Sequence, residues 1–499
     1  MSNPKLTAIT IVGGGTAGWM TAALLSKVLI GFDISLIESD EIGTIGVGEA
    51  TIPAIKIFNH MLGLNEAEFM RATQATFKLG IEFANWRAPD HSYIHGFGKI
   101  GTDLLWLHTH QFWLKMKTMG PVPSFDHYAL NCMAARQGSF LVPDRTQGPP
   151  LSDLDYAYHF DATLYAQYLR KFSEERGVKR IEGKITTVHL NPLNGFIDNV
   201  GLVSGQTIAG DLFIDCSGMR SLLLGDALGV GFEDWSQWLL CDRALAVPCE
   251  RIMPLPPHTR SMAHGSGWQW RIPLQHRTGN GHVYSSTHMS DDEAHHLLMT
   301  HLDHKPTSEA RKIQFRPGKR LRAFEKNCVA IGLSAGFLEP LESTSIHLIQ
   351  TGLLRLLSLF PGQAFHERDR LEYNRQTDFE YNDIRDFIIA HYKVTHREDT
   401  PFWAYLKHMS VPTSLQDKLD LFSSSARLFR RSAAELFTME SWIQVLLGQD
   451  IAVTAHDPMV DMIPLDDIKQ YLRDIEEVIA HHCQAMPPHE AFIARYCKA

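Results

Sequence analysis

A glycine-rich turn between a strand and a helix, within the first twenty residues, leaves few folds open to this chain of 499 residues. The short β-branched run 9–12 predicts a buried parallel strand, and it leads into a GxGxxG pattern on Gly13, Gly15 and Gly18. The next residues, 19–25, predict a helix. In a dinucleotide-binding turn the first glycine allows the tight bend. The second lets the backbone approach a pyrophosphate, and the third lets the helix pack on the strand.

The residues around this turn supply two more parts of a dinucleotide site. Thr16 and Ala17 begin the helix, whose N-terminal N–H groups and positive dipole end would face the phosphates. A second predicted strand, 33–37, ends at Glu38, where a carboxylate would accept hydrogen bonds from ribose hydroxyls. Because Ser, Asp and Glu follow Glu38, rather than Arg, a 2′-phosphate is not expected. We predict a bound dinucleotide; the alternative is a glycine-rich turn without a ligand.

Two later segments favour FAD as the dinucleotide. Residues 210–218 and 328–336 each predict a strand followed by a turn of small residues. They resemble the pairs with which flavoproteins of the glutathione-reductase class complete their FAD site, which adds Asp215, Gly332 and Leu333 to the candidates. The chain has no second GxGxxG for a nicotinamide nucleotide, which suggests that electrons come from outside. Hydroxylases of this class nevertheless bind nicotinamide without a second fingerprint.

A lysine lies in a segment with the period of a strand. Residues 76–83 alternate polar and apolar side chains, which predicts one strand with Thr76, Lys78, Gly80 and Glu82 on the same face. By itself Lys78 is typical of a solvated surface lysine. If it lined a cavity, its ammonium, with an ordinary pKa of about 10.4, would be a strong hydrogen-bond donor.

A glutamate precedes the start of a second predicted helix. Apolar residues at helical spacing from 346 to 357 indicate an amphipathic helix, with Ser343 or Thr344 as a natural N-cap. The backbone N–H groups around Thr344 and Ser345 would form an anion-accepting helix start. Glu342, just ahead of this cap, is either a carboxylate that complements the helix dipole or an active-site carboxylate beside an anion site.

The segment WQWRIP, residues 268–273, carries two tryptophans two positions apart. On a strand they would point the same way, and Pro273 would end that strand. Two such tryptophans usually belong to a core. The alternative is a rigid wall that shields a reactive centre.

These segments, in this order, resemble the flavin-dependent halogenases of the tryptophan halogenase family over nearly the whole chain. The shared motifs are GGGTAGW at 13–19, GVGEATIP at 46–53, FKLGIEFANW at 77–86, WQWRIP at 268–273 and PLEST at 340–344. The resemblance implies FAD, as FADH2, and a halide ion, bromide or chloride, as cofactors. It adds Gly48, Glu49 and Ala50 to the FAD candidates. It also implies that O2, FADH2 and halide yield hypohalous acid, which crosses a tunnel to an electron-rich arene.

The resemblance also implies roles for individual residues. Lys78 would hold or carry the halogen, and Glu342 would polarise it and remove the arenium proton. Thr344 and Ser345 would receive the halide. The wall between flavin and substrate would consist of Trp268, Trp270, Ile272 and Pro273. The substrate would meet His95, Phe97, Phe437 and Trp442, although a surface turn or a core aromatic is the alternative for the first two.

Some positions depart from the family pattern. Ser345 stands where glycine is common and would reshape the halide pocket, so bromide is favoured over chloride. Gly96 stands where proline is frequent. The run 427–434 contains no tyrosine, so a free amino-acid zwitterion would lack partners. We therefore predict a more open site for indole or another electron-rich arene rather than free tryptophan.

The predicted fold is α/β, with a Rossmann-like FAD-binding domain of the glutathione-reductase class from residues 1–90 and 150–380. Residues 91–149 and 381–499 would form a mostly helical substrate-side subdomain. One amphipathic stripe in it is formed by Ile468, Tyr471, Leu472, Ile475, Val478 and Ile479. The resemblance implies a separate NAD(P)H-dependent flavin reductase and a small aromatic substrate as partners, and it is compatible with a homodimer.

Composition excludes several other classes. The net charge of −9, from 47 Lys and Arg against 56 Asp and Glu, argues against nucleic acid or an anionic membrane as a partner. No apolar run approaches the roughly 18 residues of a membrane span, and the N-terminus leaves no room for a signal peptide. Seven scattered cysteines without a CxxC pair predict reduced thiols in a cytoplasmic protein. The histidines lack metal-ligand spacing, so we expect no metal.

Two other functions share the FAD motifs. A flavin-dependent aromatic monooxygenase would add oxygen instead of halogen, and Lys78 with the tryptophan pair would distinguish the two. A flavin-binding module without catalysis would have no activity to lose when Lys78 is replaced.

Overall fold

A six-stranded sheet at one end of the molecule carries the N-terminal turn. In this computed structural model, residues 6–41, 49–144, 146–362 and 365–499 are described. The predicted first strand is β1 (Ala8–Val12), which pairs in parallel with its neighbours on both sides. In spatial order the strands are β20 (Phe324–Glu325), β21 (Cys328–Ala330), β12 (Leu212–Asp215), β1, β2 (Asp33–Glu38) and β8 (Lys179–Glu182). Both small-residue turns predicted after 210–215 and 328–330 therefore follow strands of this sheet.

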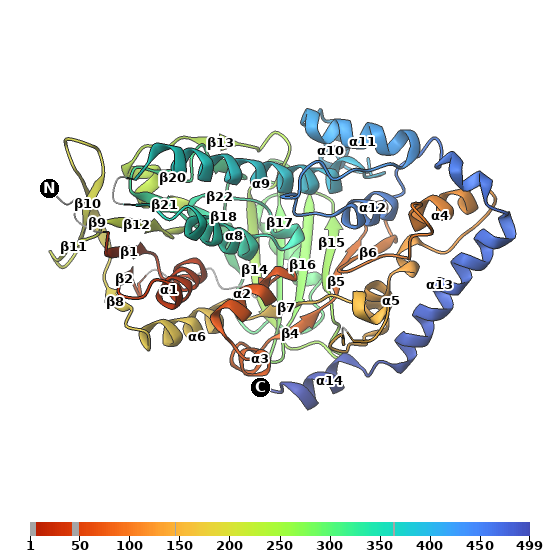
Figure 1. Ribbon diagram of the computed structural model, residues 1–499, viewed down its shortest axis with the longest axis horizontal. Helices are drawn as coiled ribbons and strands as arrows, with labels where there is room; N and C mark the ends of the chain where they lie inside the picture. Colours follow the sequence, from red (N-terminus) through yellow and green to blue (C-terminus); the bar gives the residue numbers. More distant parts are fainter. Residues whose placement is uncertain (1–5, 42–48, 145, 363–364) are drawn as a thin grey trace.

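Helices cover this sheet and meet beside the glycine-rich turn. Helix α1 (Thr16–Val28) packs against α6 (Ala162–Glu174) and α8 (Ser345–Ser358), although α8 begins more than 300 residues later (Figure 1). Gly332 illustrates how closely they approach, because a Cβ there would lie 3.0 Å from Ala17 and 3.2 Å from Ile349. The start of α8 and the start of α1 thus belong to one neighbourhood.

A seven-stranded sheet forms the middle of the molecule (Figure 1). Its order is β18 (Arg311–Gln314), β14 (Arg243–Cys249), β17 (Thr278–Tyr284), β16 (Gly267–Pro273), β15 (Thr259–His264), β5 (Gly80–Ala84) and β6 (Ser92–Gly96). The pairs are antiparallel except for β15 with β5. As predicted, Pro273 is the last residue of its strand.

The prediction of one continuous strand over 76–83 is wrong. The chain forms β4 (Thr76–Lys78), which pairs with β7 (Ala157–Phe160), and then β5, which joins the central sheet. Between them the Leu79 N–H donates to the Pro257 carbonyl, 2.7 Å away, so the backbone leaves one sheet and enters another. Lys78 and Glu82 therefore do not share a face.

The C-terminal part is helical, as predicted, and wraps one side of the central sheet (Figure 1). Its helices are α9 (Glu367–Lys393), α10 (Pro401–His408), α11 (Thr413–Ser425), α12 (Met439–Gly448), α13 (Leu465–Ala485) and α14 (His489–Tyr496). Helix α13 packs on α4 (Thr109–Lys117) and α5 (Leu130–Gln137). Its predicted stripe is buried at Ile468, Leu472 and Ile479, but Val478 is 44% exposed because α13 presents only one narrow face to these helices.

Shorter elements complete the described residues. The additional helices are α2 (Ala54–Leu62), α3 (Glu66–Ala72) and α7 (Asp291–Thr300). The additional strands are β3 (Glu49–Ala50), β9 (Ile185–Leu190), β10 (Ile197–Leu202), β11 (Thr207–Ala209), β13 (Phe232–Asp234), β19 (Gly318–Arg320) and β22 (Gly336–Phe337). All seven cysteines are buried free thiols. Within the described ranges, no helix is long and apolar enough to cross a membrane.

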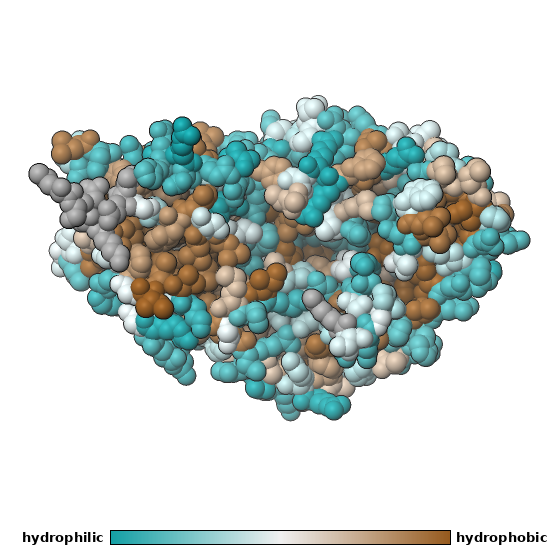
Figure 2. All heavy atoms as spheres, in the orientation of Figure 1, coloured by the Kyte–Doolittle hydropathy of each residue, from teal (hydrophilic) through white to brown (hydrophobic). Residues whose placement is uncertain are grey.

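The surface is divided in the same way as the fold. Figure 2 shows hydrophobic atoms gathered over the region of α1 and α8, and a hollow between that region and the helical part. Secondary structure crosses the boundaries that we predicted between the two subdomains. Helix α9 runs through the boundary at residue 380, and β6, which follows the boundary at residue 90, pairs with β5, which precedes it.

Candidate active site

The glycine-rich turn has the geometry that its pattern predicts. Gly13 has a φ of +111°, and a Cβ there would lie 2.2 Å from the carbonyl oxygen of Cys216. A Cβ on Gly18 would lie 1.8 Å from the Gly13 carbonyl oxygen, so only glycine lets the helix approach the strand. At Gly15, by contrast, nothing in the described part of the chain lies within 4 Å of that position. The protein chain therefore fills the space beside Gly13 and Gly18. The space beside Gly15 is open, and there the backbone of the turn would contact a ligand.

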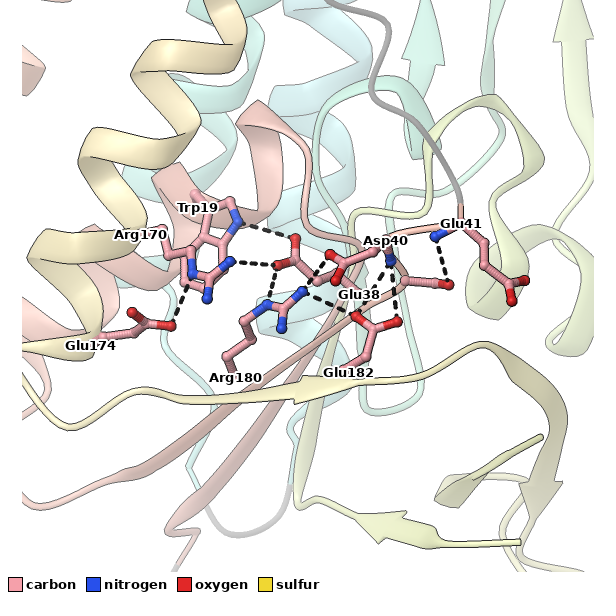
Figure 3. Close-up of polar contacts among 9 residues, drawn as sticks. Trp19, Glu38, Asp40, Glu41, Arg170, Glu174, Arg180 and Glu182 are labelled. Carbon is pink, nitrogen blue, oxygen red and sulfur yellow. Dashed lines mark hydrogen bonds and ion pairs between the residues drawn. The ribbon is translucent and has the colours of Figure 1, made fainter. Parts of the chain in front are cut away.

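Glu38, at the end of β2, is held by a polar cluster that the sequence did not predict (Figure 3). Trp19 Nε1 donates to its Oε2 over 3.3 Å, and Arg180 Nε donates to its Oε1. Arg170 from α6 lies 3.7 Å away. Arg180 also contacts Asp40 at 2.6 Å, so its charge is compensated on two sides. Both arginines lie more than 130 residues after Glu38, and neither belongs to the local motif.

The other candidate FAD residues lie on three further elements. Glu49 and Ala50 form β3, and burial raises the pKa of Glu49 to about 7. Asp215 ends β12, where its carboxylate accepts hydrogen bonds from Ser334 Oγ and from backbone N–H groups. Gly332 and Leu333 begin the short helix that follows β21; Gly48 lies outside the described residues.

Lys78 is fully buried, contrary to the interpretation as a surface lysine. Its Nζ donates to the Thr51 carbonyl and to Ser343 Oγ, both at 2.9 Å, and lies 5.2 Å from the centre of the Phe97 ring. Burial disfavours the ammonium and lowers the pKa of Lys78 to about 7, although Glu342 opposes the shift. The Lys78 side chain is thus buried with its Nζ within hydrogen-bond reach of Ser343, the residue next to Glu342.

Glu342 is equally buried and is contacted by two histidines. His95 Nδ1 lies 3.0 and 3.1 Å from its two carboxylate oxygens, and His391 Nε2 lies 2.7 Å from Oε1. Burial alone would raise the pKa of Glu342, but His95 and His391 together lower it to about 2. The carboxylate is therefore kept ionised inside the protein. His391 was not predicted, because no local motif marks it.

The start of α8 has the features of an anion site. Of the two predicted N-cap candidates, Thr344 is the N-cap, but its buried Oγ1 makes no hydrogen bond to the described residues. The preceding Ser343 has a φ of +59° and accepts from Lys78. The first N–H groups of a helix have no partner within that helix, and the halide site expected at Thr344 and Ser345 stays a prediction.

The tryptophan pair forms part of the core of the central sheet. Trp268 and Trp270 are 6.2 Å apart between ring centres, and Trp270 lies over Gly281, where a Cβ would lie 2.0 Å from the indole ring. Trp268 Nε1 donates to Glu339 Oε2 over 3.0 Å, and burial raises the pKa of Glu339 to about 7. Ile272 and Pro273 continue the same buried strand.

Three of the predicted substrate residues gather around Phe387, which was not predicted. Phe437 stacks on Phe387 with ring centres 3.8 Å apart, and Trp442 meets it at 4.8 Å. His95 lies 5.7 Å from the same ring. Phe97 lies instead beside Lys78. The predicted residues therefore form an aromatic cluster that borders the Glu342 carboxylate through His95.

The geometry agrees with comparisons to known proteins. A family model described as tryptophan halogenase matches residues 8–465. The chain belongs to the tryptophan halogenase family. A curated relative, the tryptophan 7-halogenase RebH of Lentzea aerocolonigenes, is 36% identical over 501 residues and covers 92% of each chain.

Solved structures of the family share the whole fold. Xcc4156, a flavin-dependent halogenase from Xanthomonas campestris, is 48% identical, with a TM-score of 0.95 and 99% of each chain covered. BrvH, a flavin-dependent halogenase from Brevundimonas sp. BAL3, is 45% identical, with a TM-score of 0.94 and coverage of 98% and 99%. The predicted family, the Rossmann-like FAD-binding fold and the flavin-dependent halogenase function are confirmed; the monooxygenase alternative is not favoured.

Proposed function

We propose that this halogenase transfers bromine or chlorine to a small electron-rich arene such as indole, with Lys78 and Glu342 as its catalytic residues. The observation that carries the proposal is the burial of both charged groups close to each other: Lys78, on β4, donates to Ser343, the residue that follows Glu342. Burying a lysine and a carboxylate costs free energy even when both are hydrogen-bonded, and such buried ionisable groups cluster at functional sites.

FAD fits the open turn at Gly15. When bound as FADH2, with O2 and halide, it would supply hypohalous acid. We propose that the turn from Gly13 to Gly18 holds the pyrophosphate and that Glu38 holds the adenosine ribose. Glu49, Ala50, Gly332 and Leu333 would line the remaining length of the FAD. A separate NAD(P)H-dependent reductase would supply the reduced flavin.

Replacing Gly14 by alanine is expected to weaken FAD binding about tenfold or more, or by at least ~1.4 kcal/mol. The new Cβ would lie 2.4 Å from the Cβ of Glu38, so the carboxylate would have to move away from the ribose position. Titration of the purified protein with FAD, followed by flavin fluorescence, would measure the affinity. Gly120→Ala is the matched control because the described residues leave open space around Gly120. Equal affinities for the two variants would contradict the assignment of Glu38.

We propose that Lys78 donates a hydrogen bond to the oxygen of hypohalous acid. An ammonium in a dry site makes the halogen more electrophilic and fixes its position relative to the arene. Glu342, held ionised, would stabilise the cationic ring and take up its proton. Trp268, Trp270, Ile272 and Pro273 would keep the arene away from the flavin.

The aromatic cluster supports a flat, neutral substrate. Phe437 and Trp442 offer ring surfaces in the cluster, and Phe97 offers one beside Lys78. Of the three arginines in 427–431, Arg427 pairs with Asp457 and Arg430 donates to two backbone carbonyls. The carboxylate of free tryptophan would compete with these contacts. We therefore propose indole or a similar arene as substrate.

We propose that bromide is preferred over chloride. Ser345 places a side chain at the first residue of α8, where the halide would approach the backbone N–H groups. A hydroxymethyl group there changes the shape of the pocket and favours the more easily dehydrated and more easily oxidised ion.

One incubation tests the proposed function. The protein is combined with FAD, a flavin reductase, NADH and equal concentrations of bromide and chloride, and indole, tryptophan and phenols are screened by mass spectrometry. We expect brominated indole as the main product. Products heavier by one oxygen atom would identify a monooxygenase, and a dominant chlorinated product would reject the bromide preference.

The rate of halogenation is expected to fall as the pH rises through about 7. The pKa of Lys78 is lowered to about 7, so the ammonium loses its proton over this range and no longer donates to the oxygen. Product formation is measured against pH with hypohalous acid release measured in parallel. The pH midpoint of the rate is compared between bromide and chloride. The same midpoint with both halides would assign the loss of rate to Lys78 and not to ionisation of the hypohalous acid. A rate that rises through pH 7 would indicate that the neutral amine carries the halogen.

A further inference from the structure

Next to the aromatic cluster, two carboxylates share one ammonium away from water. Lys418 of α11 donates from Nζ to Glu435 Oε2 over 3.3 Å, and its Nζ lies 3.9 Å from Asp383 Oδ1 on α9. The side chains of Lys418, Asp383 and Glu435 are 10%, 8% and 6% exposed. The second oxygen of Glu435 accepts from the Arg431 N–H over 2.9 Å. Because the site is buried, the ammonium offsets the repulsion between the two carboxylates.

The same lysine covers a ring of the aromatic cluster. Its Nζ lies over the Trp442 indole, 4.4 Å from the ring centre, which is within the range of a cation–π contact. Trp442 also meets the Phe387 ring at 4.8 Å. The indole Nε1 is buried and makes no hydrogen bond to the described residues. Ring contacts, including the one with Lys418, therefore hold the indole in place.

The segment before Phe437 is tied to the same charged residues. The Leu436 N–H donates to Asp383 Oδ2 over 3.0 Å, and the next residue, Phe437, stacks on Phe387 one helical turn after Asp383. Residues 427–438 form neither helix nor strand. The position of the Phe437 ring therefore depends on contacts of this kind and not on a regular backbone.

We propose that Lys418 determines the substrate specificity of this halogenase as a positioning residue. Through its carboxylate partners it holds Phe437, and through its cation–π contact it holds Trp442, so that the cluster admits a single flat arene of the size of indole. The proposal rests on the proposed function, in which both rings contact the substrate. Without the ammonium, the segment loses its tie to α11 and the indole ring loses the charge above it. The cluster would then admit larger arenes and hold indole less firmly.

The Lys418→Met variant removes the ammonium and keeps most of the side-chain volume. We expect the KM for indole to rise about tenfold while kcat stays within about twofold, because Lys78 and Glu342 are unchanged. When indole and 2-phenylindole compete at equal concentration, the share of the larger product, measured by mass spectrometry, should rise about tenfold. Lys418→Arg keeps the charge and should restore most of the preference for indole. Hypohalous acid release should be unchanged in both variants.

Two further variants separate positioning from stability. Lys407→Met is the matched control and should keep the preference for indole, because Lys407 makes its ion pair with Glu398 at the surface. Lys418→Met combined with Glu435→Gln removes a carboxylate that the single variant leaves without its cation. This double variant should unfold at a higher temperature than Lys418→Met and keep the relaxed specificity. Restored preference for indole in the double variant would trace the change to unpaired charge and overturn the proposal.

The product ratios distinguish this proposal from the proposed function. An unchanged ratio in Lys418→Met, with a changed ratio in Trp442→Leu, would overturn the role of Lys418 alone. Unchanged ratios in both Trp442→Leu and Phe437→Leu would reject the aromatic cluster as the substrate site as well. A fall in kcat/KM by the same factor for both arenes in Lys418→Met would show a purely structural role and also reject the proposal.

Discussion

The Lys78→Met variant is expected to continue releasing hypohalous acid while forming at least about 10³-fold less halogenated arene. Methionine keeps most of the buried volume of the lysine but removes the donor that lies between Thr51 and Ser343. The flavin-binding turn is built from other segments, so hypohalous acid formation should not depend on this side chain. Product is measured by mass spectrometry, and free hypohalous acid by its reaction with an added trap.

Lys78→Ala serves as a second variant, because it also leaves a cavity. If both variants release hypohalous acid without halogenating the arene, the ammonium itself is required. Loss of FAD binding in Lys78→Met would mean that the lysine is structural. Retained halogenation in either variant would contradict the proposed mechanism.

The Glu342→Gln variant is expected to lower the turnover of halogenation by about 10²- to 10⁴-fold. Glutamine has nearly the same shape but carries no negative charge to stabilise the arenium ion and is a poor acceptor for its proton. Hypohalous acid release should stay near normal, since other residues, Thr344 and Ser345, form the predicted halide site. Turnover within a few-fold of the unmodified protein would reject the catalytic role of Glu342.

A kinetic isotope effect gives an independent measurement for the same variant. If proton removal is slowed, arene deuterated at the reacting carbon should react more slowly than protonated arene in Glu342→Gln. The unmodified enzyme serves as the reference. Equal rates for the two arenes in the variant would assign the loss to an earlier step.

The dinucleotide-binding part was predictable because its determinants are local. The bend at Gly13, the close packing at Gly18 and the strand that ends at Glu38 each follow from consecutive residues with restricted backbone geometry. Helix α8 and its N-cap Thr344 were predictable for the same reason. The family resemblance added the pairing of Lys78 with Glu342, which no spacing rule supplies.

What only the tertiary structure decided is which side chains are buried together. The sequence by itself determined the strand, turn and helix of the proposed dinucleotide site, because neighbouring residues settle that geometry. It predicted one strand over 76–83, whereas pairing with β7 and then with β6 divides the segment and buries Lys78. His391 reaches Glu342 from a separate helix. Burial and electrostatic contacts depend on partners that are distant in the chain and close in space, and no local pattern encodes them.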